Sequence, residues 1–448
     1  TIHDPGYNPD PHWNVPMRIN LYCGAPADTQ NGQEAWGYVA VRNDASMFWW
    51  LYYANSPTHS YSELPLVMWL QGGPGASGTG YGNFEEIGPL DKNLNRRKYS
   101  WVEAASLLFV DNPVGTGYSY TTNANAFAKD LNMVVSDMMI LLKEFFLKKP
   151  EFQNIPFYIF SESYGGKMAA GIALALVQAV QRNEIHCRFA GVSLGDSWIS
   201  PLDSVLSWGP YLYSMSLLDD RGLEEVNSYA DQVQKAIEAG NYKQATDLWG
   251  ATEFAILRNT DGVNFYNIMT KEPADAVVEM AVPMKNHYLV NLYSNHVRRL
   301  QKTSLDVLMN GPIRDKLKII PSFVRWGGQS NAVFNNMEED FMKPVIDIVD
   351  KLLAANVNVS VFNGQLDLIV DTVGQEAWVK KLKWPGLSSF LSGHWKPLYI
   401  PSKPDEAAAF FKQQNNFSFY WVIKAGHMVP SDQGEMALKM LRMITRQE

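Results

Sequence analysis

The sequence predicts an α/β fold in which a mostly parallel sheet is flanked by helices and interrupted by a helical insertion. Two observations carry this prediction. Short apolar runs without polar alternation recur along both ends of the 448-residue chain, as expected for strands buried on both faces of a parallel sheet. Helical patterns such as Ala128–Phe146 separate these runs, and alternation of strand and helix is typical of α/β architecture.

The expected strands are rich in Val, Leu, Phe and Trp and are bounded by turn residues. They lie at Trp36–Arg42, Phe48–Ala54, Leu64–Leu70, Ser106–Val110, Phe157–Phe160, Phe189–Leu194, Val357–Phe362 and Phe419–Lys424. The first two flank the stretch Asn43–Ser46, which we interpret as a hairpin turn because Asn, Asp and Ser favour turn conformations.

Strand patterns become sparse between about Pro201 and Pro321. Charged helical patterns such as Asp220–Ala239 and Tyr242–Leu257 dominate there. We therefore expect residues 201–321 to form a helical cap, inserted into a core made of residues 1–200 and 322–448. Neither an internal repeat nor a low-complexity linker occurs, which disfavours a second domain that folds separately.

Composition narrows the class of protein. Hydrophobic residues make up 46% and charged residues 19% of the chain, as in globular proteins. The net charge of −8 argues against nucleic acid or an anionic membrane as a main partner. No apolar run reaches the roughly 18–20 residues that span a bilayer, so no membrane span is expected.

Other features concern the cellular route. The chain starts at Thr1 without Met or an apolar leader, which we interpret as a mature fragment whose signal peptide is missing. Glycosylation triplets begin at Asn358 and Asn416; they favour a secretory route, lysosomal or secreted, although such triplets also arise by chance. The two cysteines, Cys23 and Cys187, either pair with each other or are both free.

Ser163 is the candidate nucleophile. It follows the expected strand Phe157–Phe160 and precedes a helix rich in small residues, Gly165–Val180. A nucleophile elbow needs small residues two positions before and after the serine, and Ser161 and Gly165 meet that need. An ordinary strand-to-helix turn has the same outline, so this motif alone does not decide.

A glycine-rich stretch, Gln71-Gly-Gly-Pro-Gly-Ala-Ser, directly follows the expected strand Leu64–Leu70. Backbone N–H groups in such a loop can face a developing oxyanion, and the expected donors are the N–H groups of Gly73 and Tyr164. A phosphate-binding loop is the alternative, but no Gly-Lys-Ser/Thr ends the motif.

A serine hydroxyl also needs a base, and the base needs an acid. Asp367 follows a late expected strand and His427 follows the last one, on the side where open α/β sheets build their sites. Asp371 and His394 are the rivals for these roles. The eight histidines show no zinc-binding spacing, so neither a metal nor a cofactor is expected.

Five motifs together resemble the serine carboxypeptidase family, whose fold is that of the α/β-hydrolases. They are Gln71-Gly-Gly-Pro-Gly-Ala-Ser, Asp111-Asn-Pro-Val-Gly-Thr-Gly-Tyr-Ser-Tyr, Glu162-Ser-Tyr-Gly-Gly-Lys, Asn363-Gly-Gln-Leu-Asp and Gly426-His-Met-Val-Pro. The resemblance runs in order from about Gly37 to the end of the chain, insertion included, and is closest to an animal branch of the family.

The resemblance implies an exopeptidase that removes one residue from the C-terminus of a peptide, with peptide and protein C-termini as its partners. By motif, Ser163, Asp367 and His427 would be the catalytic triad, and Gly73 and Tyr164 the oxyanion hole. The remaining implied residues bind the substrate carboxylate or line its cleft: Gln71, Gly72, Glu86 and Glu162, with Tyr81 in the cleft.

Three residues depart from the family pattern. Gln71 stands where Asn is usual, Ala76 where Cys is usual and Ser161 where Gly is usual. None of these changes removes a group that the chemistry needs, so we expect an active enzyme. The longer Gln71 side chain is expected to shift either the position of the substrate carboxylate or the preferred substrate.

Glu162, next to the nucleophile, suggests a preference for acidic pH. A substrate carboxylate beside Glu162 and Glu86 brings three like charges together, and a shared proton would convert that repulsion into a hydrogen bond.

Two rival functions remain at this stage: transfer of the acyl group to an alcohol or amine, and a non-catalytic binding or protective role. The oligomeric state is open, with a homodimer as one arrangement.

Overall fold

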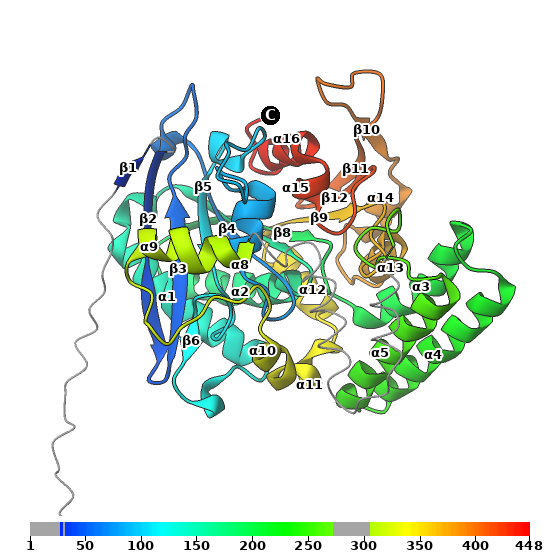
Figure 1. Cartoon of the computed structure of the whole chain (residues 1–448). Helices are drawn as coiled ribbons and strands as arrows, with labels where there is room; N and C mark the ends of the chain where they lie inside the picture. The colour runs from blue at the N-terminus through cyan, green and yellow to red at the C-terminus, as the bar shows by residue number, and fades with distance from the viewer. Residues whose placement is uncertain (1–26, 30–31, 272–304) are drawn as a thin grey trace, which may run out of the picture.

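One twisted sheet forms the centre of the protein (Figure 1). The computed structural model describes residues 27–29, 32–271 and 305–448. Within them the strand order is β1-β2-β3-β5-β4-β7-β8-β9-β12-β11-β10, with β6 paired to β3. The middle of the sheet is parallel and both flanks are antiparallel, which confirms the mixed α/β class with a mostly parallel core.

The parallel strands are short, apolar and buried. They are β4 (Leu66–Leu70), β5 (Ser106–Val110), β7 (Pro156–Glu162), β8 (Arg188–Gly195), β9 (Asn358–Gly364) and β12 (Phe417–Val422). Each overlaps an expected strand, because helices cover both faces and leave no solvent-facing side to be polar.

The flanking strands are antiparallel. They are β1 (Ala27–Thr29), β2 (Gly32–Arg42), β3 (Ala45–Tyr52), β6 (Tyr120–Thr121), β10 (Lys396–Leu398) and β11 (Ala409–Gln414). The expected hairpin between β2 and β3 is confirmed. The sequence pattern did not predict β1, β6, β10 and β11, which are short or partly polar.

Helices cover the sheet on both faces and occupy most of the described part of residues 201–321. The α-helices are α1 (Leu131–Lys148), α2 (Tyr164–Gln181), α3 (Pro201–Ser214), α4 (Asp220–Glu238), α5 (Tyr242–Asn259), α8 (Leu305–Leu308), α9 (Arg314–Leu317), α10 (Asn331–Asn336), α11 (Glu338–Phe341), α12 (Ile346–Ala354), α13 (Thr372–Val379), α14 (Leu387–Ser392), α15 (Val429–Asp432) and α16 (Gly434–Ile444). Short 3₁₀ turns lie at Tyr61–Glu63, Trp101–Glu103, Ala124–Ala126 and Pro150–Phe152, and π-helical turns at Gly78–Ile87 and Met309–Ile313.

Side-chain caps fix where several helices begin. Asp130 accepts from Met133 N before α1, Asp219 accepts from Gly222 N before α4, and Asp371 accepts from Gly374 N before α13. Among the described residues, no helix combines the length and the apolar composition that a membrane crossing needs.

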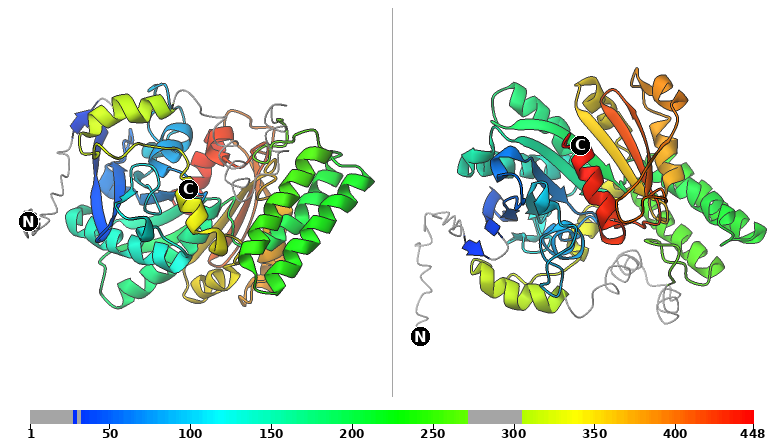
Figure 2. Two further views of the ribbon diagram at one scale, coloured as in Figure 1. Left: turned by 60° about the horizontal axis from the view of Figure 1, so that its bottom comes forward. Right: turned by 90° about the horizontal axis from the view of Figure 1, so that it is seen from above.

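The predicted insertion reaches two distant parts of the sheet. Helices α3, α4 and α5 project beyond one end of the molecule, whereas α8 and α9 cross the strands β2 and β3 at the other (Figures 1 and 2). There Trp36 Nε1 donates to Leu317 O over 3.0 Å, and Lys316 forms an ion pair with the buried Glu34. The division of the chain at residues 201 and 321 stays a prediction.

Close packing between β8 and β9 yields a stability prediction. A methyl group at Gly195 would lie 2.0 Å from Cζ of Phe362, a core side chain with 1% exposure. We expect Gly195→Ala to lower the apparent free energy of unfolding by about 1–3 kcal/mol, because an overpacked core must distort.

The matched control is Gly327→Ala, whose added carbon would meet only Gln329 O at 3.9 Å. It should change stability by less than about 0.5 kcal/mol. Urea denaturation followed by tryptophan fluorescence measures both variants. Equal shifts for the two would contradict a rigid contact between Gly195 and Phe362.

Candidate active site

Ser163 lies on a strained turn between β7 and α2. Its φ and ψ are 61° and −132°, a region that residues other than glycine rarely adopt. Main-chain hydrogen bonds hold the turn: Ser163 N donates to Gly195 O, and Trp198 N donates to Ser163 O. The hydroxyl makes no capping bond to α2, although it stands at the capping position, so it is not committed to its own helix.

Close backbone approaches around the turn explain the small residues of the motif. A methyl group at Gly165 would lie 2.4 Å from Leu70 O, and one at Gly72 would lie 2.9 Å from Ser163 Oγ. At the position where the motif departs from glycine, Ser161 is fully buried and its hydroxyl donates to Ser193 O over 3.0 Å. The departure at Ser161 is therefore accommodated by a satisfied hydrogen bond.

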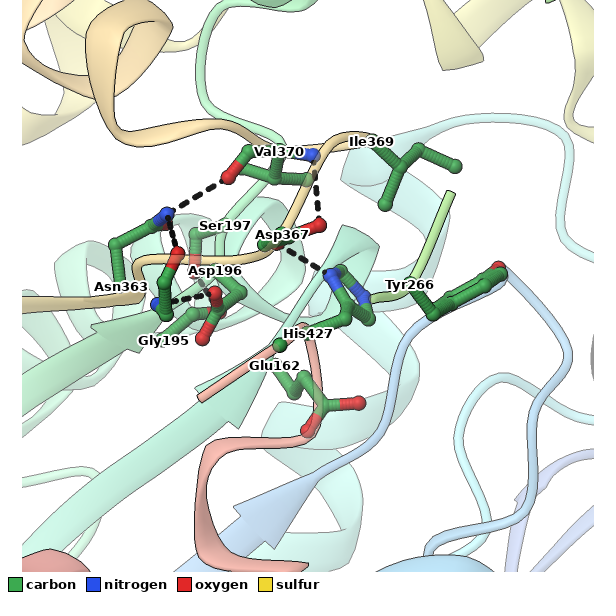
Figure 3. Close-up of polar contacts among 12 residues, drawn as sticks. Glu162, Gly195, Asp196, Ser197, Tyr266, Asn363, Asp367, Ile369, Val370 and His427 are labelled. Carbon is green, nitrogen blue, oxygen red and sulfur yellow. Dashed lines mark hydrogen bonds and ion pairs between the residues drawn. The ribbon is translucent and has the colours of Figure 1, made fainter. Parts of the chain in front are cut away.

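Asp367 and His427 come from loops after β9 and β12 and meet in a buried contact (Figure 3). Nδ1 of His427 lies 2.8 Å from Oδ2 of Asp367, and Val370 N donates to the other oxygen of Asp367 over 3.3 Å. The two loops touch because both carry glycine: a methyl group at Gly364 would lie 2.0 Å from Gly426 O.

Neither rival occupies this position. Asp371 is engaged in capping α13 and accepts a hydrogen bond from Ser207 Oγ over 2.7 Å, and burial raises its pKa to about 7. His394 is exposed, in the loop before β10. The described geometry therefore joins Asp367 with His427 and leaves Asp371 and His394 in structural settings.

Segment 265–268, from the predicted insertion, supports both loops. Phe265 O accepts from Leu368 N and Ile369 N, and Tyr266 O accepts from His427 N over 2.8 Å. The Tyr266 ring also packs edge-on against the His427 ring, with centroids 4.9 Å apart. Nothing in the sequence pattern around Tyr266 singles it out, because the contact arises only when the chain folds back on itself.

Gln71 bridges two buried glutamates. Its Nε2 donates to Glu86 Oε1 over 2.9 Å and to Glu162 Oε1 over 3.0 Å, while its Oε1 accepts from Trp69 Nε1 over 2.8 Å. Both amide hydrogens of Gln71 are thus already used. Oε2 of Glu86 and Oε2 of Glu162 are buried and receive no hydrogen bond from the described residues, which favours a proton retained by this pair of acids.

The protonation of these groups follows from burial and like charge. Burial raises the pKa of Glu86; burial and the charge of Glu86 raise that of Glu162 well above its usual range. The pair of Glu86 and Glu162 therefore retains one proton. Burial lowers the pKa of His427, an effect that the charges of Asp196 and Glu86 oppose. A neutral imidazole consequently persists to more acidic pH than in a free histidine.

A buried ion pair anchors the start of α2. Lys167 Nζ lies 2.9 Å from Oδ2 of Asp340 in α11, and Tyr164 O–H donates to the same oxygen over 2.5 Å. Burial lowers the pKa of Lys167 to about 8, while the charge and hydrogen bond of Lys167 outweigh burial and lower that of Asp340. Tyr164 is the first residue of α2, so its N–H has no acceptor within the helix.

The remaining predicted residues occupy varied settings. Gly73 has a left-handed φ of 110°, and Tyr81 is buried with its ring 6.2 Å from that of Trp326. Asn358 and Asn416 are half-buried, and their side-chain nitrogens donate to main-chain carbonyl oxygens. Glycan attachment there stays a prediction.

One of the two cysteines lies within the described residues. Cys187 is a free thiol, and burial raises its pKa to about 12, which makes it unreactive. Cys23 lies outside the described residues.

Comparison with known proteins identifies the family. A family model described as serine carboxypeptidase matches residues 26–447. The chain belongs to the serine carboxypeptidase family. A human relative named retinoid-inducible serine carboxypeptidase is 63% identical over 445 residues, covering 98% of each chain. Serine carboxypeptidase-like 51 of Arabidopsis thaliana is 44% identical and covers 93% of each.

A solved structure confirms the fold. Kex1, a prohormone-processing carboxypeptidase from Saccharomyces cerevisiae, matches with a TM-score of 0.78 over 93% of this chain and 92% of that chain. At 23% identity the match concerns the fold alone. The predicted α/β-hydrolase fold and the predicted membership of the serine carboxypeptidase family are both confirmed.

The buried ion pair between Lys167 and Asp340 gives a stability prediction. Lys167→Met leaves the Asp340 carboxylate buried without its counter-charge, so the free energy of unfolding should fall by about 3–5 kcal/mol. The control Lys351→Met breaks an exposed pair with Asp347 and should change stability by less than about 0.5 kcal/mol. Thermal and urea denaturation at neutral pH measure both. Similar losses in the two variants would contradict a special role for the buried pair.

Proposed function

We propose that this member of the serine carboxypeptidase family removes single residues from peptide C-termini through an acyl-enzyme on Ser163. The contact between His427 and Asp367, at the same end of the sheet as the Ser163 turn, carries the proposal. The role of each residue below is part of it.

Acylation begins with attack of Ser163 Oγ on the carbonyl carbon of the last peptide bond. His427 accepts the hydroxyl proton, and Asp367 stabilises the imidazolium that forms. The N–H groups of Gly73 and Tyr164 receive the oxyanion. His427 then gives its proton to the leaving nitrogen, the C–N bond breaks, and the last residue departs as a free amino acid.

Deacylation repeats these steps with water. His427 takes a proton from the water, the resulting hydroxide adds to the ester carbonyl, and the proton returns to Ser163 Oγ as the C–O bond breaks. The peptide leaves shorter by one residue. Transfer of the acyl group to an added amine would use the same intermediate, so its yield measures how well water competes.

Recognition of the substrate carboxylate is assigned to Gln71, Gly72, Glu86 and Glu162. Because both amide hydrogens of Gln71 already bind the two glutamates, Gln71 mainly holds the acids in place. A protonated acid is the group that can donate to an incoming carboxylate. Glu162, whose pKa burial and the charge of Glu86 raise well above its usual range, supplies that donor. Tyr81 is the weakest assignment, since its ring is buried against Trp326.

The shifted pKa values of His427 and Glu162 favour peptide hydrolysis at acidic pH. The lowered pKa of His427 leaves the base neutral in mild acid, and the raised pKa of Glu162 keeps one proton in the carboxylate site there. Such conditions occur in lysosomes. We therefore include a secretory-pathway location, lysosomal or secreted, in the proposal, with peptide or protein C-termini as partners.

The first test concerns the nucleophile. A fluorescent organophosphonate should label the wild-type chain and should not label Ser163→Ala, because only an activated serine reacts. Ser161→Ala is the matched control; it removes a nearby buried hydroxyl and should still be labelled. Labelling of Ser163→Ala, or no labelling of the wild type, would contradict a catalytic Ser163 and favour a non-catalytic binding role.

The second test concerns pH. As pH rises, Glu162 loses its proton and the added negative charge repels the substrate carboxylate, so KM for a blocked dipeptide should rise. KM for the matching C-terminal amide should rise much less. Glu162→Gln, which cannot ionise, should flatten the pH dependence of KM for the dipeptide. Identical KM profiles for the dipeptide and its amide would contradict the shared-proton site.

A further inference from the structure

A third acid stands behind the contact between Asp367 and His427. Asp196 follows β8 directly, is fully buried, and has a left-handed φ of 40°. One ligand atom from each of Asp196, Asp367 and His427 lies within 4.8 Å of the others. Figure 3 shows the three side chains converging, with Glu162 close by.

Only one of the two carboxyl oxygens of Asp196 accepts a hydrogen bond from the described main chain. Gly364 N donates to its Oδ1 over 2.8 Å, and Asp196 N donates to Phe362 O over 2.8 Å. Its other oxygen, Oδ2, is buried and receives no hydrogen bond from the described residues. A buried carboxyl oxygen without a donor is costly as an anion, but it is satisfied if it carries a proton and donates.

The neighbouring groups decide where that proton lies. Burial raises the pKa of Asp367 as well, but Asp367 accepts from two donors, His427 and Val370 N, and these hydrogen bonds favour its ionised form. Burial and the charge of Asp367 raise the pKa of Asp196 well above its usual range, and only His427 opposes them among nearby side chains. Glu162 lies in the same field, because the charges of Asp196 and Asp367 raise its pKa too.

We propose that Asp196 is a positioning residue, which keeps its proton, donates it to the Asp367 carboxylate and thereby orients Asp367 toward His427. Three donors then hold Asp367: His427, Val370 N and Asp196. The bond from Asp196 also withdraws negative charge from Asp367, which helps to keep the imidazole neutral in acid. This inference rests on the proposed function, because it assigns Asp196 a task in activating Ser163.

A metal ion bound by Asp196, Asp367 and His427 explains this cluster less well than a shared proton does. Two acids and a histidine can surround a cation, but Nδ1 of His427 already engages Asp367 at hydrogen-bonding distance. A proton between Asp196 and Asp367 accounts for the close approach without a further ion.

Two substitutions of Asp196 distinguish a role as a hydrogen-bond donor from a role as a negative charge. In Asp196→Asn the amide oxygen can accept from Gly364 N, and the amide N–H can donate to Asp367 as a protonated acid would. Asp196→Ala removes both bonds. We measure the rate of organophosphonate labelling of Ser163 and kcat for a blocked dipeptide amide from acidic to alkaline pH. The amide is chosen because it lacks the carboxylate that Glu162 and Glu86 would bind.

We expect Asp196→Asn to keep the labelling rate and kcat within about threefold of the wild type in acid. Asp196→Ala should lose about 10- to 100-fold in both, as when an orienting hydrogen-bond partner is removed. Above the raised pKa of Asp196 the wild type loses the donor and gains a charge, so its activity should fall. Asp196→Asn should retain activity at the same pH.

Failure of this inference differs from failure of the proposed function. If the wild type is not labelled at all, the catalytic role of Ser163 fails. If the wild type is labelled but Asp196→Ala reacts equally fast, the positioning role of Asp196 fails. An Asp196→Asn variant as slow as Asp196→Ala also overturns it, since a charge or a metal ligand would then be required. Thermal melting of both variants shows whether a loss comes from unfolding instead.

Discussion

The burial of four carboxyl groups around one imidazole is the constraint on which the rest of the site depends. Glu86, Glu162, Asp196 and Asp367 all have 4% exposure or less. The charges of Glu86 and Asp196 act on His427, and Arg97 also acts on Glu86. Four anions cannot be accommodated there, so protons must be shared within pairs. Gln71 donates hydrogen bonds to Glu86 and Glu162, and the main-chain N–H of Gly364 donates one to Asp196. These bonds hold the acids in place.

This constraint links the two halves of the proposed chemistry. The pair of Glu86 and Glu162 faces the substrate end, and the pair of Asp196 and Asp367 faces the base. Because charge on one pair raises the pKa of the other, ionisation of either affects both binding and proton transfer. Acidic pH keeps both pairs singly protonated. A single physical condition, retention of two protons, therefore connects recognition of the C-terminus with activation of the serine.

Much of this arrangement was predictable from sequence, for physical reasons that differ between elements. The parallel strands were found because burial on both faces makes them continuous apolar runs; β10 and β11, partly exposed, lack that signal. Asp367 and His427 were predicted from chain order and from their places just after late strands. Asp196 and Tyr266 were not found, because a single acid after a strand and a single aromatic in a long helical segment have no distinctive local pattern. Their roles arise from contacts between distant parts of the chain.

The backbone of Ser163 shows what the chain tolerates at its centre. A left-handed φ with an extended ψ costs a non-glycine residue about 1–3 kcal/mol, and glycine would adopt it with little strain. The serine therefore lowers the stability of the fold at the point where β7, β8 and α2 meet. Glycine at position 163 would relieve this strain, but it would remove the hydroxyl that the proposed function assigns as the nucleophile.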